Sequence, residues 1–236
     1  MAKNIGIIGG MGPRATVEFE KLILDQFEGG DQTLPGIISY NAGAIPDRSR
    51  FLVEDGQDPV PAIQNAIDQL AKTDVDVLCM PCNTAHVPLI ADRLDMRGIY
   101  FIHMPELVAD KLRQAGMKRV AILATSGTVS SGMYQSMLSS SGIEAIEPPA
   151  TIQQAVTQII QDVKAGDINS ARRAMPVVNS FLTSTASQAA VLACTELSFI
   201  ANDVASGVRV VDTLSELAQA VASYTMVVKE TVYDAR

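Results

Sequence analysis

Short apolar runs alternate with longer amphipathic segments along this chain of 236 residues. The short runs are apolar at successive positions, which is typical of strands buried on both faces in a parallel sheet. The longer segments repeat their apolar residues at helical spacing. This alternation predicts a doubly wound α/β fold, in which ligands bind at the carboxyl ends of strands. The predicted strands cover residues 4–8, 36–40, 75–80, 100–102, 119–124, 190–193 and 209–211, and the predicted helices cover residues 15–27, 60–71, 85–94, 105–115, 131–140, 151–164, 171–182 and 213–228.

The two halves of the chain resemble each other. Residues 5–12 (IGIIGGMG) are echoed by residues 120–127 (VAILATSG), and the element Cys82-Asn83-Thr84 corresponds to Cys194-Thr195-Glu196 after a later apolar run. The repeat predicts two pseudo-symmetric α/β lobes, each with a mostly parallel sheet flanked by helices, and an active site in the cleft between them. One lobe would contain residues 1–97 and 211–236, and the other residues 98–210. A thiol on each side of one cleft suits moving a proton between the two faces of a carbon.

The amino-acid composition indicates which kinds of binding partner and which cellular location are compatible with this chain. A hydrophobic fraction of 47% with 19% charged residues is typical of a soluble globular protein. The net charge of −8 argues against nucleic acid, and an anionic substrate would need local arginine or lysine. No stretch approaches the roughly 18 apolar residues of a membrane span, and the first residues lack the layout of a signal peptide. Three cysteines without framework spacing argue against disulfides, so we expect a cytoplasmic protein.

Cys82 is the best candidate for chemistry. It follows a predicted buried strand and begins a predicted helix, where backbone N–H groups stabilise a thiolate. Asn83 and Thr84 add hydrogen-bond donors suited to a carboxylate. The alternative is a buried, inert cysteine whose two polar neighbours cap the next helix.

Cys194 occupies the same position in the second half. Thr195 is again a donor beside the thiol, and Glu196 would act as a base or orient another group. Alone, this segment fits a strand end followed by a helix cap at Thr195 and an acidic first turn. The equivalent placement of two thiols favours the functional interpretation.

Cys79 forms a C-x-x-C pair with Cys82, a spacing that also occurs in thiol–disulfide oxidoreductases. Such a redox pair usually opens a helix, whereas Cys79 lies inside the predicted strand. We therefore interpret Cys79 as core packing.

Two further loops follow predicted strands. Residues 9–13 (GGMGP) expose backbone amides that would suit an anion, although they are not G-x-G-x-x-G and no acidic residue ends the second strand. The sequence thus gives no support for a nucleotide site, and a tight turn is the alternative. Residues 125–128 (TSGT) are the counterpart in the second half and equally fit a helix cap.

Charged and imidazole side chains offer fewer candidates. Arg48 lies in a predicted loop after the second strand, and its guanidinium suits a carboxylate, although an exposed ion pair with Asp47 is the alternative. Lys164 is equally compatible with an ordinary helix end. His86 and His103 have no partner at metal-ligand spacing, so we expect structural roles and no metal.

Three segments resemble the aspartate/glutamate racemase superfamily, and most closely its aspartate racemase branch. They are IGGMGPRAT at residues 8–16, MPCNTAH at 80–86 and ACTEL at 193–197, and the resemblance covers essentially the whole chain. The glutamate racemase branch usually has an Asp-Ser pair in the first loop and a histidine after the second Cys-Thr. This chain has Gly10-Met11 and Glu196 there, and Ala193 where the family has glycine.

The resemblance implies a mechanism without a cofactor, in which Cys82 and Cys194 exchange the roles of general base and general acid. It implies that Asn83, Thr84 and Thr195 hold the α-carboxylate, and that Arg48 and Lys164 hold carboxylates across the cleft. Met11 matches a pocket-lining position. The predicted substrate-binding residues are therefore Met11, Arg48, Asn83, Thr84, Ala85, Thr125, Lys164 and Thr195, supported from behind by Asp47, Ser126, Thr128 and Glu196.

The function implied is interconversion of L- and D-aspartate by a homodimer, with a dicarboxylic amino acid as small-molecule partner and no cofactor. Glutamate or broad-specificity racemisation is an alternative, since one methylene in a pocket is worth only roughly 1–3 kcal/mol. Decarboxylation or cis–trans isomerisation on the same scaffold also remains open. A thiol–disulfide oxidoreductase using Cys79 and Cys82, or a non-catalytic dicarboxylate-binding protein, would belong to a different class.

Overall fold

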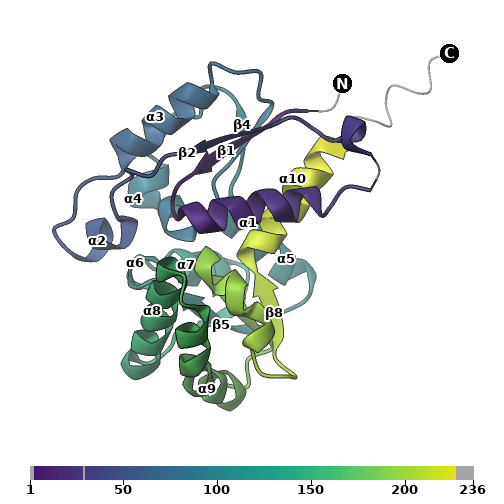
Figure 1. The fold of residues 1–236 in the computed structure, drawn as a ribbon. Helices are drawn as coiled ribbons and strands as arrows, with labels where there is room; N and C mark the ends of the chain where they lie inside the picture. The colour runs from purple at the N-terminus through teal and green to yellow at the C-terminus, as the bar shows by residue number, and fades with distance from the viewer. Residues whose placement is uncertain (1–2, 29, 227–236) are drawn as a thin grey trace.

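The computed structural model describes residues 3–28 and 30–226, and within them the strands form two parallel sheets (Figure 1). The first sheet has the order β2 (Ile37–Asn41), β1 (Ile5–Gly9), β3 (Val77–Cys79) and β4 (Tyr100–Ile102). The second has the order β6 (Glu144–Ile146), β5 (Arg119–Ala124), β7 (Ala189–Ala193) and β8 (Arg209–Asp212). The two orders are the same pattern shifted by four strands. The repeat seen in the sequence is thus a repeat of topology.

Helices cover both faces of the first sheet. Ile5 and Ile7 of β1 pack toward α1 (Pro13–Leu24) and α10 (Thr213–Met226), while Ile8 packs toward α3 (Val60–Leu70) on the other face. This alternation follows from the two-residue period of a strand. The helix α10 begins directly after the second sheet yet lies beside α1 on the first (Figure 1).

The second sheet has the same layering. Val120 and Ile122 of β5 pack toward α5 (Met104–Gln114) and α7 (Met133–Ser140), and Ala121 and Leu123 pack toward the opposite face. That face is covered by α8 (Ala150–Ala165) and α9 (Ile168–Ser184). The predicted doubly wound α/β fold, with strands apolar on both faces, is therefore confirmed.

Short elements account for the errors in the predicted boundaries. The helix predicted at 85–94 is wrong because Pro88 holds Val87 in an extended conformation and divides the segment. Gly132, with φ of +66°, likewise separates the two helices at 126–140. The strand at 144–146 was not predicted, and the last two residues of the helix predicted at 213–228 lie outside the described residues. The remaining short elements are η1 (Asp31–Thr33), α2 (Arg48–Val53), η2 (Asn83–His86), α4 (Pro88–Ala91), α6 (Ser126–Ser130) and η3 (Thr195–Asp203).

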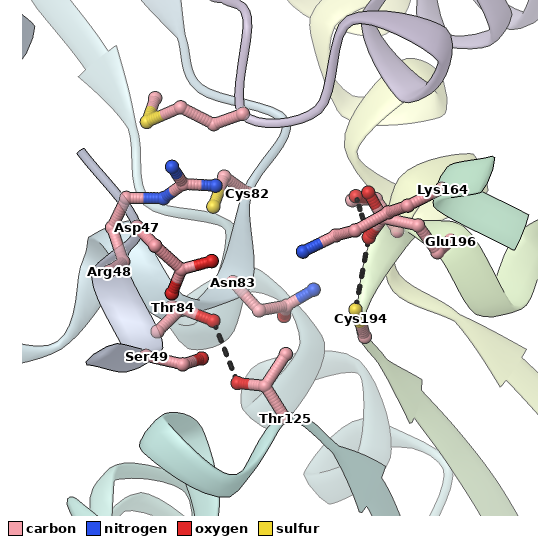
Figure 2. A pocket seen from close by; sticks show the side chains of 12 residues that line it. Asp47, Arg48, Ser49, Cys82, Asn83, Thr84, Thr125, Lys164, Cys194 and Glu196 are labelled. Atoms are coloured by element: carbon pink, nitrogen blue, oxygen red, sulfur yellow. Dashed lines mark hydrogen bonds between the residues drawn. The ribbon is translucent and has the colours of Figure 1, made fainter. Parts of the chain in front are cut away.

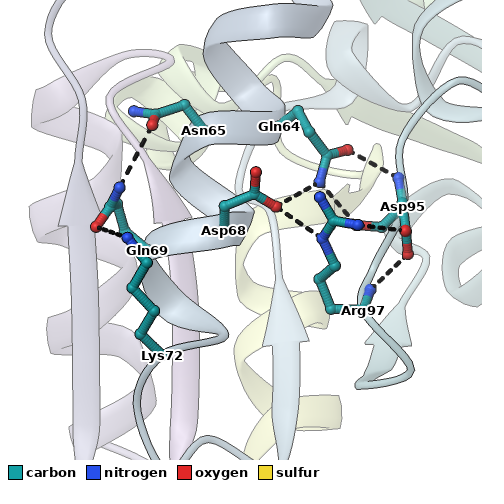
Figure 3. A network of polar contacts seen from close by, with 7 residues as sticks. All are labelled: Gln64, Asn65, Asp68, Gln69, Lys72, Asp95 and Arg97. Atoms are coloured by element: carbon teal, nitrogen blue, oxygen red, sulfur yellow. Dashed lines mark hydrogen bonds and ion pairs between the residues drawn. The ribbon is translucent and has the colours of Figure 1, made fainter.

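A polar network fixes the turn before β4 to the first half of the chain (Figure 3). Arg97 pairs with Asp68 of α3 at 2.8 Å and with Asp95 at 2.7 Å, and Gln64 bonds the backbone of Asp95. These ion pairs are exposed and contribute little to stability. They nevertheless place the turn, so that β4 pairs with β3 and the first sheet extends beyond the boundary predicted after residue 97.

At the other predicted boundary, after residue 210, β8 continues to Asp212 within the second sheet. Sheet membership thus differs from the predicted division by a few residues at each end. The division of the chain into lobes at residues 97/98 and 210/211 stays a prediction.

Candidate active site

Cys82 and Cys194 occupy equivalent positions in the two halves. Each follows one of the two inner strands of its sheet, β3 or β7, and each is the residue immediately before a 3-10 helix. Their backbone angles are similar, with φ and ψ of −157° and 105° at Cys82 and −148° and 128° at Cys194. Both side chains are buried, with 5% exposed. The repeated fold therefore presents two thiols from two opposed strand ends.

The two thiols line one cavity, together with residues of both halves (Figure 2). Arg48 and Cys82 lie on one side of this central cavity, and Lys164, Glu196 and Cys194 on the opposite side. Its free volume, counted as space for the centre of a water molecule, is about 10 Å³, which accommodates about one water. The lining consists of Met11, Asp47, Arg48, Ser49, Cys82, Asn83, Thr84, Thr125, Lys164, Cys194, Thr195 and Glu196.

Two larger cavities adjoin the central one. One of about 280 Å³ lies between the glycine-rich loop after β1 and the end of α8. The other, of about 320 Å³, lies between α2 and α8. Asp47 and Lys164 line all three cavities, so these two side chains stand between the thiols and the wider spaces.

Arg48 begins the helix α2, which corrects the prediction that it lies in a loop. The helix forms because the Asp47 side chain caps it, accepting the Arg50 backbone N–H at 2.9 Å. Arg48 itself is only 8% exposed. Its Nη1 donates to the carbonyls of Pro46 at 3.0 Å and Ile45 at 3.4 Å, while its Nε has no partner. The alternative of an exposed ion pair with Asp47 is therefore wrong, and the buried guanidinium, which lines the cavity, retains N–H capacity that no protein group satisfies.

The Asp47 carboxyl lies within reach of the charges of both Arg48 and Lys164. Desolvation acts to raise its pKa, but the Arg50 N–H and the charges of Lys164 and Arg48 outweigh that effect. The pKa of Asp47 is therefore lowered, and its carboxylate is ionised near neutral pH. Lys164 lies in the last turn of α8, which Gly166 ends with φ of +87°, as the sequence predicts.

Glu196 supplies a carboxylate beside only one of the thiols. Cys194 Sγ donates to Glu196 Oε2 at 3.1 Å, and Glu196 is 5% exposed. A Cβ at Gly12 would lie 3.0 Å from Glu196 Oε1, so the loop after β1 packs closely against this carboxylate. Burial raises the pKa of the Cys194 thiol well above its usual value, and Glu196 raises it further, while Lys164 acts in the opposite direction. Cys194 is therefore a thiol near neutral pH.

Three threonine hydroxyls join the two halves beside Cys82. Thr84 Oγ1 lies 2.9 Å from the Oγ1 atoms of both Thr125 and Thr128, which are 3.1 Å from each other. Thr125 also caps α6 by accepting the Thr128 N–H at 3.2 Å. Close packing supports this junction, since a Cβ at Gly127 would lie 2.8 Å from Ser49 Cα in α2. Ser49 also lines the central cavity, and the sequence analysis does not predict it.

Three predicted residues do not line the central cavity. Ala85 is fully buried, Thr128 lies behind Thr84, and Ser126 borders the cavity between α2 and α8. Conversely, sequence reasoning does not select Tyr134 or Thr213. Both are buried and bond the Asn83 side chain, whereas in the sequence Tyr134 resembles an ordinary helix residue and Thr213 resembles a helix cap.

Cys79 and the histidines lie outside the site. Cys79 packs in the core beneath α1 and α10, whereas Cys82 packs in the core on the other face of the sheet. Such a placement does not suit a redox pair. His86 donates from Nε2 to the Met80 carbonyl at 3.0 Å, and burial lowers its pKa to about 3. Within residues 3–28 and 30–226, no group of three or more potential ligands is placed to hold a metal ion.

Comparison with known proteins gives consistent matches over nearly the full length. A family model described as Asp/Glu/Hydantoin racemase matches residues 8–221. The structure is similar to that of Picrophilus torridus aspartate racemase, with a TM-score of 0.86 and 35% identity, covering 95% of this chain and 94% of that chain. The sequence is 27% identical to the broad specificity amino-acid racemase RacX of Bacillus subtilis over 93% of this chain and 96% of the relative. Glutamate racemase from Francisella tularensis in complex with D-glutamate shares the fold, with a TM-score of 0.69 at 16% identity, covering 100% of this chain and 84% of that chain.

Proposed function

The chain belongs to the Asp/Glu/Hydantoin racemase family and is a racemase, and we propose that it interconverts L- and D-aspartate with Cys82 and Cys194 as its two bases. The observation that carries this proposal is the placement of both thiols, at equivalent strand ends, on one cavity. A racemase without a cofactor needs a base on one face of the α-carbon and an acid on the other. The likeness to an aspartate racemase at 35% identity supports the choice of substrate.

The environment of Cys194 indicates which of the two thiols delivers the proton first. Its thiol donates to Glu196, so we assign Cys194 as the acid of the first half-reaction and Cys82 as the base on the opposite face. Cys82 takes the α-proton from one face of the amino acid, and the Cys194 thiol then protonates the resulting carbanion from the other face. The turnover leaves a Cys82 thiol and a Cys194 thiolate, which is the form required by the opposite enantiomer. Exchange of protons with water restores the resting form.

The carbanion-like state needs donors that are already in place. Asn83, Thr84 and Thr195 bring amide and hydroxyl donors to the cavity, and we assign them to the α-carboxylate. The Arg48 guanidinium, whose Nε has no protein partner, and the Lys164 ammonium are assigned to the carboxylate of the side chain. The two cations supply local positive charge for an anionic substrate in a protein whose net charge is −8.

The central cavity must widen to admit a substrate, because about 10 Å³ accommodates about one water and not an amino acid. Asp47 and Lys164 separate it from the cavities of about 280 and 320 Å³. We assign substrate entry to separation of these two side chains, which belong to opposite halves of the chain.

Broad-specificity racemisation is the second candidate. It is favoured by the likeness to a broad specificity amino-acid racemase and by the neighbouring cavity of about 280 Å³, which would accommodate a longer side chain. Glutamate is then a further substrate of the same site. The comparisons give no support to a thiol–disulfide oxidoreductase.

The setting of the enzyme belongs to the same proposal. The three cysteines are free, which suits the reducing cytoplasm, and the family resemblance suggests a homodimer. No helix among the described residues is long and apolar enough to cross a membrane.

The test is exchange of the α-proton of L-aspartate and L-glutamate in D₂O, followed by NMR with chiral analysis of the products and no added cofactor. Exchange with formation of D-aspartate is expected, and the rates rank the two substrates. Faster conversion of glutamate or neutral amino acids would favour the second candidate. Binding of L-aspartate without exchange would instead indicate a dicarboxylate-binding protein.

A further inference from the structure

The side-chain amide of Asn83 is held inside a buried chain of hydrogen bonds. Tyr134 Oη donates to Asn83 Oδ1 at 2.6 Å, and Asn83 Nδ2 donates to Thr213 Oγ1 at 2.9 Å. Thr213 Oγ1 in turn donates to the carbonyl of Leu192 at 2.9 Å. Asn83 is 2% exposed, and Tyr134 and Thr213 are fully buried. Every link therefore lies away from water, where an unmade bond is costly.

Only one assignment of donors and acceptors satisfies this chain. The Leu192 carbonyl can only accept, so the single hydroxyl proton of Thr213 is directed at it. The Thr213 oxygen must then accept from Asn83, which requires the NH₂ group of the amide at that contact. The amide oxygen consequently faces Tyr134, whose hydroxyl donates to it. Burial raises the pKa of Tyr134, so this donor stays protonated throughout the working range of pH.

The chain connects the two thiol-bearing segments. Asn83 directly follows Cys82, and Leu192 lies in β7 two residues before Cys194. Tyr134 belongs to α7 and Thr213 begins α10, so the amide of the first half is held entirely by residues of the second. An Asn amide has two N–H donors, and the chain uses one of them. The second remains for the central cavity, which Asn83 lines (Figure 2).

We propose that Tyr134 is a positioning residue of this racemase, which together with Thr213 locks the Asn83 amide so that its second N–H is a donor to the substrate α-carboxylate. The inference rests on the proposed function, since that function supplies the carboxylate. In the opposite orientation, the amide would present its oxygen to the carboxylate and repel it. Tyr134 touches no reacting atom and acts only through Asn83.

The test compares variants of nearly equal shape. Tyr134→Phe removes one hydroxyl, and Thr213→Val replaces one hydroxyl by a methyl group. Thr225→Val is the matched control, because Thr225 is also a buried threonine of α10 that donates to a carbonyl, that of Ala222 at 2.8 Å, and it does not line the cavity. We expect kcat/KM to fall about tenfold or more in the first two variants and less than about twofold in the control.

A double-mutant cycle separates positioning from general destabilisation. If Tyr134 acts through Asn83, Tyr134→Phe should lower kcat/KM by less than about threefold in an Asn83→Ala background, well short of its effect in the wild type. Equal fold-losses in both backgrounds would overturn the proposal, and so would a fall in Tyr134→Phe no larger than in Thr225→Val. The wild type is assayed for aspartate racemisation in parallel. An inactive wild type would contradict the proposed function, whereas equal fold-losses in the double-mutant cycle would contradict only the positioning role of Tyr134.

A readout independent of turnover completes the test. In protein labelled with ¹⁵N-asparagine, the side-chain N–H bonded to Thr213 should exchange slowly with water, and about tenfold or more faster in Tyr134→Phe. Unchanged exchange in that variant would overturn the locking role even if the wild type proved inactive on aspartate. Accelerated exchange together with an inactive wild type would support the lock and overturn only the substrate.

Discussion

The loops that carry Cys82 and Cys194 have nearly the same backbone but different surroundings. Both thiols precede a 3-10 helix at a strand end, and both are buried. The polar neighbours of Cys82 are tied to the second half of the chain by neutral hydroxyl and amide bonds, through Asn83 and Thr84. Cys194 instead bonds a carboxylate of its own loop, Glu196.

This difference shows how a repeated fold can serve a reaction that needs unlike partners. Two thiols in identical surroundings would compete for one proton, whereas the proposed cycle requires one thiol and one thiolate together. Burial and the charge of Glu196 both raise the pKa of Cys194 and favour its thiol form, whereas the loop of Cys82 carries hydrogen-bond donors and no carboxylate of its own. The repeated backbone places one thiol on each side of the cavity, and the neighbouring side chains make the surroundings of the two thiols different.

Removing either thiol should have the largest effect. Cys82→Ala and Cys194→Ala should each lower racemisation of aspartate by about 10³-fold or more, since each removes a general acid–base group. Cys194→Ala retains the proposed Cys82 thiolate, so it should still exchange the α-proton of one enantiomer with D₂O and return it to the same face. NMR and chiral chromatography on the same sample distinguish exchange from racemisation.

Cys79→Ala is the control for this experiment, because Cys79 is fully buried and lies off the cavity. Its turnover should stay within about twofold of the wild type. The opposite pattern, with Cys79 essential and Cys194 dispensable, would favour the redox alternative.

The cations on the two sides of the cavity should affect binding more than chemistry. Arg48→Met removes a buried guanidinium with N–H capacity left for a carboxylate, and should raise KM for aspartate about 10- to 100-fold. Lys164→Met should have a smaller effect on KM, because the exposed Lys164 is better solvated. Steady-state kinetics measure both, and Lys111→Met, which lies outside the cavity, is the control. An unchanged KM in Arg48→Met would contradict the assignment of this residue to the substrate.

Glu196→Gln tests the asymmetry directly through the pH profile. The profile of kcat/KM should be a bell whose high-pH limb reports loss of the second thiol proton. Removing the Glu196 charge lowers the pKa of Cys194, so this limb should move to lower pH and narrow the bell. The loss near neutral pH should be about tenfold or less. Because the equilibrium constant of racemisation is one, kcat/KM must change equally in both directions, which provides an internal check. A limb that stays in place would contradict the role of Glu196.

The fold and the equivalent strand-end positions of Cys82 and Cys194 could be predicted from the sequence, because buried strands appear as local apolar runs and the repeated motif relates the two halves. The catalytic role of the two thiols stays a prediction. The sequence predicts a loop at Arg48, because α2 has only six residues and its main sequence signal is the capping residue Asp47. Tyr134 and Thr213 were missed for a different reason. Their hydroxyls meet Asn83 only after α7 and the start of α10 pack against the loop of the other half, and no spacing along the chain encodes that contact.

The smallest effect on turnover is expected at His86, which closes the 3-10 helix of the Cys82 loop and has no histidine counterpart after Cys194. Burial, with a smaller contribution from neighbouring His103, lowers its pKa from 6.5 to about 3. Below pH 6.5 the His86 side chain binds a proton in the unfolded chain, whereas in the folded chain it binds one only near pH 3. The free energy of unfolding therefore falls as the pH falls from 6.5 to about 3.

Between pH 7.5 and 5 the His86 contribution to this loss should be about 2 kcal/mol in the free energy of unfolding, measured in urea. His86→Gln keeps a donor for the Met80 carbonyl but cannot titrate, and should remove most of this pH dependence while leaving turnover at neutral pH nearly unchanged. His103→Gln is the matched control and should retain most of it, because His103 is less deeply buried. If the free energy of unfolding of His86→Gln kept the full pH dependence of the wild type, the loss of stability in acid would have to arise from other groups. The Cys82 loop would then be no more sensitive to acid than the loop of Cys194.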